Sequence, residues 1–310
     1  LGGRKEKMEN YGLRIMFGPN THFSFEGKIS FSHRDSDFLE LFDSVTELLV
    51  EKFSLADFDL LFIPGSATIG AESVIKSSGS KISFPNTEGK FNQRWISISR
   101  NYGKLGDNSE GAISMGCTLE TSLSRHYSSR FDIVDAISSF PYYNIPEGCK
   151  SFITCFNKQI GSFVGLSLVG IRKDSWNLFE ASNEFSYLDL LRYKDYSSLS
   201  QTPTTTAVHI FSHLRNLLAD FDLERLRERI DTNSRILVES LGEGDIIGDP
   251  IGPVITVPKK IIPVDLASRW SLYGTTSDSE VIQFFTYSCP DEKYQLFADE
   301  FKSYGIALNE

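Results

Sequence analysis

Apolar residues recur at helical spacing in the segment that follows residue 35. In SDFLELFDSVTELLVEKF they fall on one face of a helix, with Ser36 as the expected N-cap: Phe38, Leu41, Phe42, Val45, Leu48 and Leu49. The next run, Phe58 to Ile63, is apolar except for Asp59, which is typical of a buried strand. Pro64-Gly65 ends that run with a turn, and a helix is predicted from Ala71 to Ser77. This strand–turn–helix order begins an α/β unit.

Further along the chain, short apolar runs are followed by longer helical ones. Strands are predicted in RFDIVDAISSF, whose apolar run ends at Asp135, and around Ile153 and Leu168. A helix follows in AVHIFSHLRNLLADF, and a longer, charged helix runs from about Asp222 to Leu241 and stops at Gly242. This order predicts an α/β fold with a mostly parallel central sheet flanked by helices.

The last part of the chain combines strands, proline-rich turns and one helix. GDPIGPVITVPKKIIPVDL is strand and turn, VIQFFTYS is a strand, and DEKYQLFADEFKSYG is a helix. We therefore predict three parts: an N-terminal segment (1–35), a large α/β domain (36–242) and a small α+β domain (243–310).

Composition narrows the class of protein. With 40% hydrophobic and 23% charged residues, the chain resembles an ordinary soluble globular protein. Its net charge of −10 argues against a nucleic-acid partner, which would call for a basic surface. The four cysteines form no CxxC pair and show no metal-ligand spacing, so we expect reduced thiols and no metal site.

No targeting segment is evident in the printed sequence. No apolar run approaches the length of a membrane-spanning helix, so we expect no membrane contact. The basic start LGGRKEKMEN lacks a following apolar stretch, which argues against a signal peptide. A cytoplasmic location is the expectation.

Three short stretches carry candidate chemistry, and each has a plainer explanation. In PGSATIGAE, Ser66, Ala67 and Thr68 would begin a helix after a strand, which suits a phosphate but also a simple N-cap. Asp135 ends a predicted strand, where α/β sheets bind ligands and where turns also favour aspartate. Lys158 lies between two strands, in FNKQIG, as either a solvated charge or a reagent.

One cofactor accounts for all three stretches together. Pyridoxal 5′-phosphate (PLP) needs a phosphate cup, an acid that keeps its pyridine nitrogen charged and a lysine that forms a Schiff base. Ser66 to Thr68, Asp135 and Lys158 offer these groups in the order of the chain.

The motifs in sequence also resemble a known family. The order PGSATIGAE, EGKFNQRW, LETS, IVDAISSF, FNKQIG and QTPTTTAV is similar to the class V aminotransferases of the fold-type I PLP enzymes, such as alanine–glyoxylate, serine–glyoxylate and phosphoserine aminotransferases. The resemblance runs from about Phe17 to Leu241 and more faintly beyond. It implies the PLP-transferase fold, transfer of an amino group from a small-molecule donor to a keto acceptor, and a homodimer with shared active sites.

The resemblance implies roles for residues around the cofactor ring. Lys158 would form the internal aldimine and move a proton between the substrate and the cofactor. Asp135 would pair with the pyridine nitrogen, Phe91 in GKFNQRW would stack on the ring, and Thr121 in ETS would bond on the side of its phenolic oxygen. The ordinary structural alternative for Phe91 is a core phenylalanine.

Further roles concern the phosphate and the mouth of the site. Ser66, Ala67 and Thr68 would hold the phosphate, and the amide of Asn157, where many members have glutamine, can bond near it. The resemblance also implies that Thr202 and Thr205 lie at a dimer interface. His33 and Arg34, within the segment 1–35, would lie at the active-site mouth. Turn and N-cap chemistry is the alternative for the threonines, and a solvated loop for His33-Arg34.

Two departures from the family pattern bear on function. Between NQRW and LETS we expect only a loop, where the family usually has a further αβ unit. The family also places a carboxylate-binding arginine in its last domain, but the matching strand VIQFFTYS has Phe285 and Thr286 there. Either Arg269, Arg34 or Arg14 replaces it, or the amino donor has no ordinary α-carboxylate.

Two alternative functions stay open. A PLP lyase of the cysteine desulfurase type shares the fold, but Phe91 at the stacking position and the lack of a loop cysteine oppose it, Cys289 being the nearest candidate. A non-catalytic member with a binding or structural role is opposed by the joint retention of Asp135, Lys158, GSAT and QTPTT.

Overall fold

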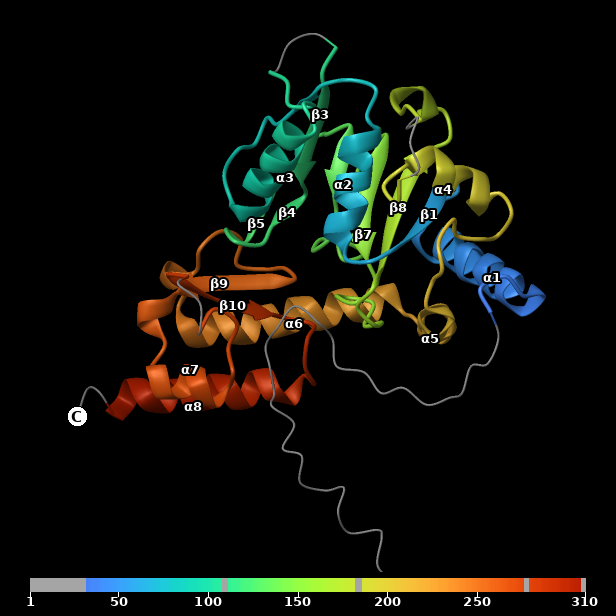
Figure 1. Ribbon diagram of the computed structural model, residues 1–310. Coiled ribbons are helices and arrows are strands. Elements are labelled where there is room, and N and C mark those ends of the chain that lie inside the picture. The colour runs from blue at the N-terminus through green and yellow to red at the C-terminus, as the bar shows by residue number, and fades with distance from the viewer. Residues whose placement is uncertain (1–31, 108–110, 182–185, 276–278, 308–310) are drawn as a thin grey trace, which may run out of the picture.

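The computed structural model describes residues 32–107, 111–181, 186–275 and 279–307. Its main sheet has the strand order β1-β8-β7-β6-β3-β2 (Figure 1). The six strands are Phe58–Pro64 (β1), Ile82–Ser83 (β2), Ile113–Cys117 (β3), Ile133–Asp135 (β6), Ser151–Cys155 (β7) and Leu166–Arg172 (β8). β2, β3, β6 and β7 pair in parallel, and β8 is antiparallel to both β7 and β1. The predicted mostly parallel α/β sheet is confirmed.

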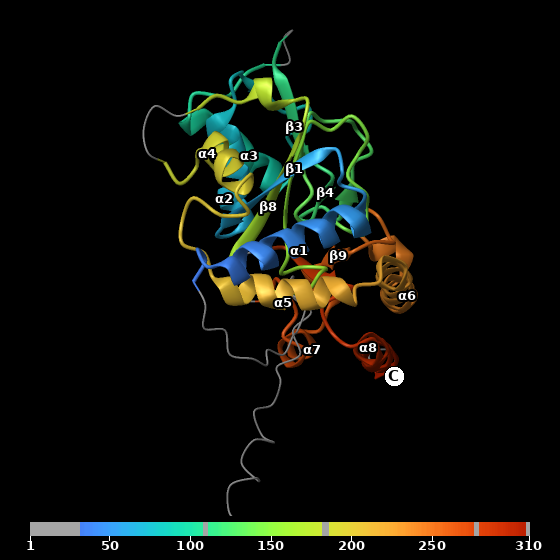
Figure 2. The same cartoon turned by 90° about the vertical axis from the view of Figure 1, so that its right-hand side faces the viewer.

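Helices cover both faces of this sheet, as Figure 2 shows. Ser36–Phe53 (α1) and Val208–Ala219 (α5) pack on one face; Ala67–Ser77 (α2), Lys90–Asn101 (α3) and Leu190–Ser197 (α4) pack on the other. Side chains of β1 alternate between the two cores: Phe62 joins the α1–α5 side and Leu61 and Ile63 the other. Burial on both faces explains why every residue from Leu60 to Ile63 in that strand is apolar.

The first helix follows its predicted face except at its cap. Phe38, Leu41, Phe42, Val45 and Leu49 are buried, and Leu48 is partly buried. The N-cap, however, is Asp35 and not Ser36. Asp35 has an extended backbone, and its carbonyl already accepts the N–H groups of Phe38 and Leu39, so Ser36 is the first helical residue.

The expectation of a mere loop between NQRW and LETS is wrong. Helix α3 continues through that segment to Asn101, and β3 follows it inside the sheet, in parallel with β6. This strand is short and contains Gly116, which weakens its apolar pattern. A Cβ on Gly116 would lie 2.6 Å from the ring of Phe131, so a larger residue there would have to displace that ring. Helix α2 likewise begins at Ala67, earlier than its apolar pattern indicates.

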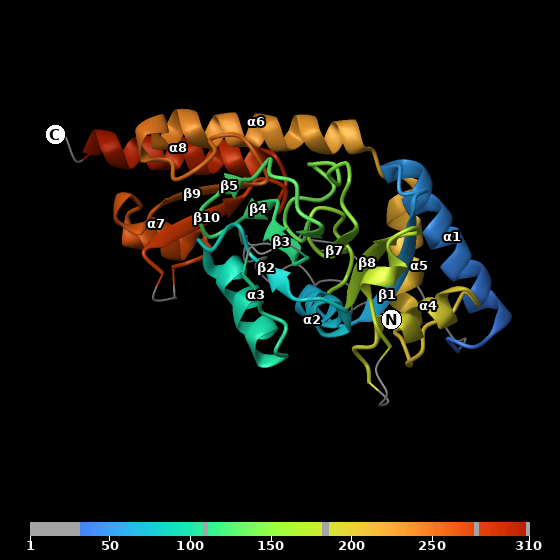
Figure 3. The same ribbon diagram turned by 90° about the horizontal axis from the view of Figure 1, so that it is seen from above.

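The C-terminal part forms a second, smaller α+β unit. Helix α6 spans Leu223–Leu241. Its N-cap is Asp222, whose carboxylate accepts the N–H of Arg225, and Gly242 follows its last residue, as predicted. An antiparallel ribbon of β9 (Val254–Pro258) and β10 (Val281–Phe285) packs with α7 (Val264–Arg269) and α8 (Glu292–Ala307). Helices α6 and α8 lie side by side in Figure 3. The exact limits 1–35, 36–242 and 243–310 stay a prediction.

Several short elements lie outside these two sheets. A two-stranded ribbon joins β4 (Leu119–Glu120) and β5 (Arg125–His126). Single 3-10 turns occur at Trp176–Leu178, Glu243–Asp245 and Lys259–Ile261. Within the described ranges, no helix combines the length and the apolar character that crossing a membrane requires.

Candidate active site

The sheet gathers the three predicted stretches at one edge. β1, β6 and β7 run in the same direction, because β8 is antiparallel to both of its neighbours and β6 is parallel to β7. Their carboxyl ends therefore meet at one edge, where Ser66 to Thr68 follow β1, Asp135 ends β6 and Lys158 follows β7. The N–H of Gly65 donates to the carbonyl of Gly165 at 2.9 Å, which ties the turn before α2 to the end of the lysine loop.

Lys158 is held in place by the segment that follows Asp135. Its Nζ donates to Ser138 Oγ at 2.6 Å, and its side chain is half-buried. The next residue, Gln159, is buried; its amide donates to the carbonyl of Ser138 at 2.7 Å and accepts the N–H of Tyr142 at 2.9 Å. The lysine is therefore directed by a hydrogen-bonded loop, which a merely solvated surface charge does not need.

Asp135 is buried and hydrogen-bonded on both carboxylate oxygens. Oδ2 accepts from the indole Nε1 of Trp95 at 2.8 Å and from Cys117 Sγ at 3.2 Å, and Oδ1 accepts the N–H of Ile137 at 2.9 Å. Burial raises the pKa of Asp135, whereas these three donors and the nearby Lys158 ammonium lower it; the net direction is upward. Whether Asp135 is ionised therefore depends on these donors and on the nearby Lys158.

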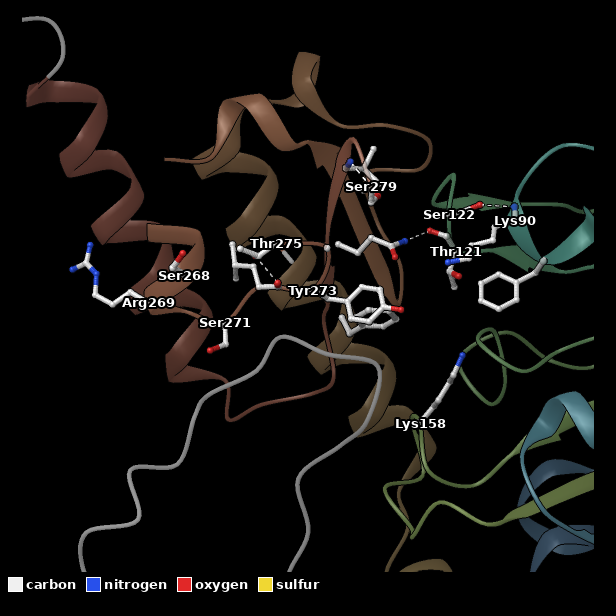
Figure 4. A pocket seen from close by; sticks show the side chains of 16 residues that line it. Lys90, Thr121, Ser122, Lys158, Ser268, Arg269, Ser271, Tyr273, Thr275 and Ser279 are labelled. Carbon is white, nitrogen blue, oxygen red and sulfur yellow. Dashed lines mark hydrogen bonds between the residues drawn. The ribbon is translucent and has the colours of Figure 1, made fainter. Parts of the chain in front are cut away.

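A cavity of about 710 Å³ lies between the main sheet and the C-terminal unit, and Lys158 reaches it from below in Figure 4, pointing toward Thr121. Thr121 and Phe91 line it from the side of the sheet. Gln283 of β10 and Tyr273, which lies between α7 and β10, line it from the C-terminal unit. Among the described residues that line the cavity, three are cationic and none is acidic: Lys90, Lys158 and Arg269. In a chain with net charge −10, this lining favours anionic ligands.

Phe91 and Thr121 are positioned by a buried carboxylate. Glu120 Oε2 accepts the N–H groups of Phe91 and Asn92, at 3.1 and 3.2 Å, and so closes the first turn of α3. The guanidinium of Arg94 lies 5.0 Å from the centre of the Phe91 ring, and the amide of Gln283 donates to the carbonyl of Thr121. The structure brings Phe91, Thr121 and Lys158 to one cavity, as the family resemblance implied.

Neither the start of α2 nor Asn157 lines this cavity. Ser66 is the N-cap of α2 and makes no side-chain capping bond, so its hydroxyl is not used to close the helix. The first turn of any helix leaves N–H groups without intrahelical acceptors, here around Ala67 and Thr68. Asn157 is half-buried on the lysine loop.

Other predicted residues lie apart from the cavity or are engaged elsewhere. The guanidinium of Arg34 bonds to the amide of Gln201 and lies 5.2 Å from the centre of the Tyr196 ring. His33 is next to it, and burial together with the Arg34 charge lowers the pKa of His33. Arg14 lies outside the described residues.

Thr202 and Arg269 are engaged in contacts within the chain. Thr202 is buried and its hydroxyl donates to the carbonyl of Thr204 at 2.8 Å, whereas Thr205 is exposed. Arg269 lines the cavity, but its guanidinium forms ion pairs with Glu300 and Asp265 and points away from Lys158 in Figure 4. These contacts place Arg269 poorly for clamping a substrate carboxylate.

Sequence reasoning missed Trp95, Cys117 and Ser138. Trp95 stands in the quoted motif GKFNQRW, one helical turn after Phe91, so its spacing within α3 is the signal that could have found it. Cys117 and Ser138 carry no local pattern, because their contacts with Asp135 and Lys158 exist only in the folded sheet.

Comparison by sequence finds a distant relative of the chain. No protein-family model matches the chain. It is 22% identical over 246 residues to the soluble hydrogenase 42 kDa subunit of Anabaena cylindrica, and it spans 63% of that protein's length.

Solved structures match much more of the chain. An aspartate aminotransferase of subgroup IV from Thermus thermophilus has a TM-score of 0.77 at 17% identity, over 93% of this chain and 97% of that one. Alanine–glyoxylate aminotransferase from Nostoc sp. has 0.74 at 16% identity, over 94% of each. PLP-bound phosphoserine aminotransferase from Trichomonas vaginalis has 0.72 at 18%, over 88% and 90%. The chain therefore has the α/β fold of these aminotransferase structures.

Proposed function

We propose that the protein is a PLP-dependent aminotransferase that moves an amino group from a small-molecule donor to a keto acceptor. The observation that carries this proposal is the Lys158 amine: it opens into a cavity, is oriented by Ser138 and lies close enough to the buried Asp135 to lower its pKa. Similarity of fold to aminotransferase structures supports the reaction class.

The residues present suit PLP. The cofactor combines a phosphate dianion, an aromatic ring with a protonatable nitrogen and an aldehyde that condenses with amines. The chain offers, in the same order, the start of α2, a buried carboxylate at the end of β6 and a primary amine after β7. When bound, PLP would supply the aldehyde and an electron-withdrawing ring.

The chain's own groups would then handle charge and protons. Asp135 would hold a proton on the ring nitrogen through a charged hydrogen bond, which its ionised form alone can accept. Lys158 Nζ would carry the cofactor and, once released by the donor amine, take and return the proton of the substrate carbon. Ser138 Oγ, 2.6 Å from Nζ, would keep the amine directed at that carbon.

The remaining contacts would bind and orient. Ser66, Ala67 and Thr68 would hold the phosphate with backbone N–H groups and hydroxyls, with the amide of Asn157 alongside. Phe91 would cover one face of the ring, and Thr121 would bond to its oxygen; both line the cavity with Lys158.

We further propose that the protein works as a homodimer. Thr205 is exposed at the loop before α5, so its hydroxyl is available to the phosphate of a second copy. Buried Thr202 would stabilise that loop through its bond to the Thr204 carbonyl.

Burial of the thiols argues against the lyase alternative. All four cysteines are free and buried, and Cys289 is only 2% exposed within the C-terminal core. Burial also raises the pKa of Cys289 to about 11, so it stays a neutral thiol at pH 7. A cysteine nucleophile needs an accessible thiolate, which none of these offers.

Titration of the purified protein with PLP, followed by visible absorbance, tests the proposed function. We expect a saturable band of protein-bound cofactor, which amino donors discharge and keto acids restore. A band that no amine discharges would favour the non-catalytic alternative, and no band at all would exclude a PLP enzyme.

Arg269→Gln should raise the KM for a carboxylate-bearing donor by no more than about twofold, because exposed ion pairs such as those of Arg269 contribute little. Loss of a true carboxylate clamp would remove about 1.5–3 kcal/mol, or more than tenfold in KM. Steady-state KM values for the wild type and Arg269→Gln decide between these; a rise above tenfold would return Arg269 to the substrate site.

A further inference from the structure

We propose that Trp95 and Cys117 are positioning residues that keep the Asp135 carboxylate oriented and ionised, and that they thereby set how tightly the site holds PLP. This inference rests on the proposed function. It concerns two neutral donors that share one oxygen of the carboxylate, the indole N–H of Trp95 and the thiol of Cys117.

The fold brings the two donors to one oxygen. Cys117 and Asp135 are direct partners in the parallel register of β3 and β6, so their side chains project from the same face of the sheet. Trp95 reaches the same face from α3. Its Nε1 lies 2.8 Å and Cys117 Sγ 3.2 Å from Oδ2, and both residues are fully buried.

Both groups donate to the carboxylate. An indole nitrogen has no acceptor capacity. Burial, followed by the charges of Asp135 and Glu120, raises the pKa of Cys117 well above its usual value, so the thiol keeps its proton. With Oδ2 occupied by two donors and Oδ1 bonded to the Ile137 N–H, the plane of the carboxylate is fixed.

The donors also offset the cost of burying the charge. Asp135 is buried, and burial raises its pKa. Three titratable groups interact with it from the elements packed around it: Lys158, Cys117 and Cys155. Glu120 acts on Cys117. Of these, only Lys158 favours the ionised form by charge, and that amine would be engaged when the cofactor binds. The Ile137 N–H and the two side-chain donors, Trp95 and Cys117, then favour the ionised form of Asp135.

The direction in which removing a donor changes PLP binding can therefore be predicted. Without the Trp95 or Cys117 bond, the pKa of Asp135 rises further and its carboxylate can rotate. A neutral Asp135 cannot hold a protonated ring nitrogen by charge, so PLP affinity falls. As pH decreases, this fall begins at a higher pH in the variant than in the wild type.

Trp95→Phe keeps the ring bulk and removes the N–H. We expect its PLP dissociation constant at pH 7 to be about tenfold higher, since hydrogen bonds to charged groups are worth about that factor or more. Trp176→Phe is the matched control, because Trp176 Nε1 donates to Asp59 Oδ2 at 2.6 Å near the opposite end of β1. It should leave the PLP dissociation constant unchanged.

A second pair guards against misfolding of the tryptophan variant. Cys117→Ser retains a donor hydroxyl and should bind PLP within about twofold of the wild type, whereas Cys117→Ala should bind more weakly. Optical PLP titrations between pH 5 and 9 give both the affinity and its pH dependence. Wild-type affinity and pH profile in folded Trp95→Phe and Cys117→Ala would overturn the inference.

A measurement without PLP separates this inference from the proposed function. Titration of the Asp135 carboxyl carbon by NMR, assigned with Asp135→Asn, should show protonation at higher pH in Trp95→Phe than in the wild type. If wild-type protein fails to bind PLP while this difference is present, the proposed function fails and the positioning role stands. Equal titration curves would refute the positioning role whatever PLP does.

Discussion

Lys158→Ala should lower the rate of amino-group transfer by about 10²–10⁴-fold, the usual contribution of a positioned acid–base group. The amine would both carry the cofactor and move the substrate proton, and Ser138 Oγ is the hydrogen-bond partner that orients it. Lys158 lies in a loop and is half-buried, so its removal should leave the fold intact. Single-turnover reaction of the PLP-loaded protein with an amino donor, followed by absorbance, measures the effect.

Lys150→Ala is a suitable control for the lysine variant. Lys150 precedes β7 at the opposite end of the same strand and pairs with Asp132 at 2.8 Å. It should retain the wild-type rate within about twofold, because a surface ion pair contributes little to stability. Equal rates in the wild type and Lys158→Ala would contradict the role of Lys158.

Phe211→Ala should reduce the free energy of unfolding by about 3–5 kcal/mol, the usual cost of truncating a buried phenylalanine. Phe211 is fully buried between α1, α5 and the sheet. Its ring centre lies 5.1 Å from that of Phe38 and 5.0 Å from that of Phe62, in edge and tilted arrangements that add to burial. Urea unfolding of the cofactor-free protein measures the change.

Leu199→Ala provides the comparison on the surface, because Leu199 is 62% exposed. It should cost less than about 0.5 kcal/mol. If Phe211→Ala were as mild as this control, the packing of α5 on the sheet would be wrong.

Much of the fold could be predicted because its long elements carry strong local signals. The apolar faces of α1 and α5 repeat at helical spacing, and α6 has both a capping aspartate, Asp222, and a stopping glycine, Gly242. The segment between Trp95 and Leu119 was misjudged because β3 is five residues long and owes its place to pairing with β6, which no local pattern reports.

The residues of the candidate site also differ in how far the sequence predicts them. Ser66 and Lys158 follow strand ends, and Asp135 is the last residue of a strand. Sequence patterns can locate such ends, and a parallel sheet then brings them together. Trp95 and Ser138 act through contacts across the sheet, so only the structure reveals them. The ion pair of Arg269 likewise has no local signal, because its partner Glu300 comes from the last helix. The role of Arg269 as a carboxylate clamp stays a prediction.

Borohydride reduction of the PLP-loaded protein, followed by proteolysis and mass spectrometry, tests the central claim most directly. The account predicts one covalently attached PLP per chain, on the peptide that contains Lys158, and none in Lys158→Ala. Attachment to another lysine of the same cavity, such as Lys90, or no attachment at all, would contradict it.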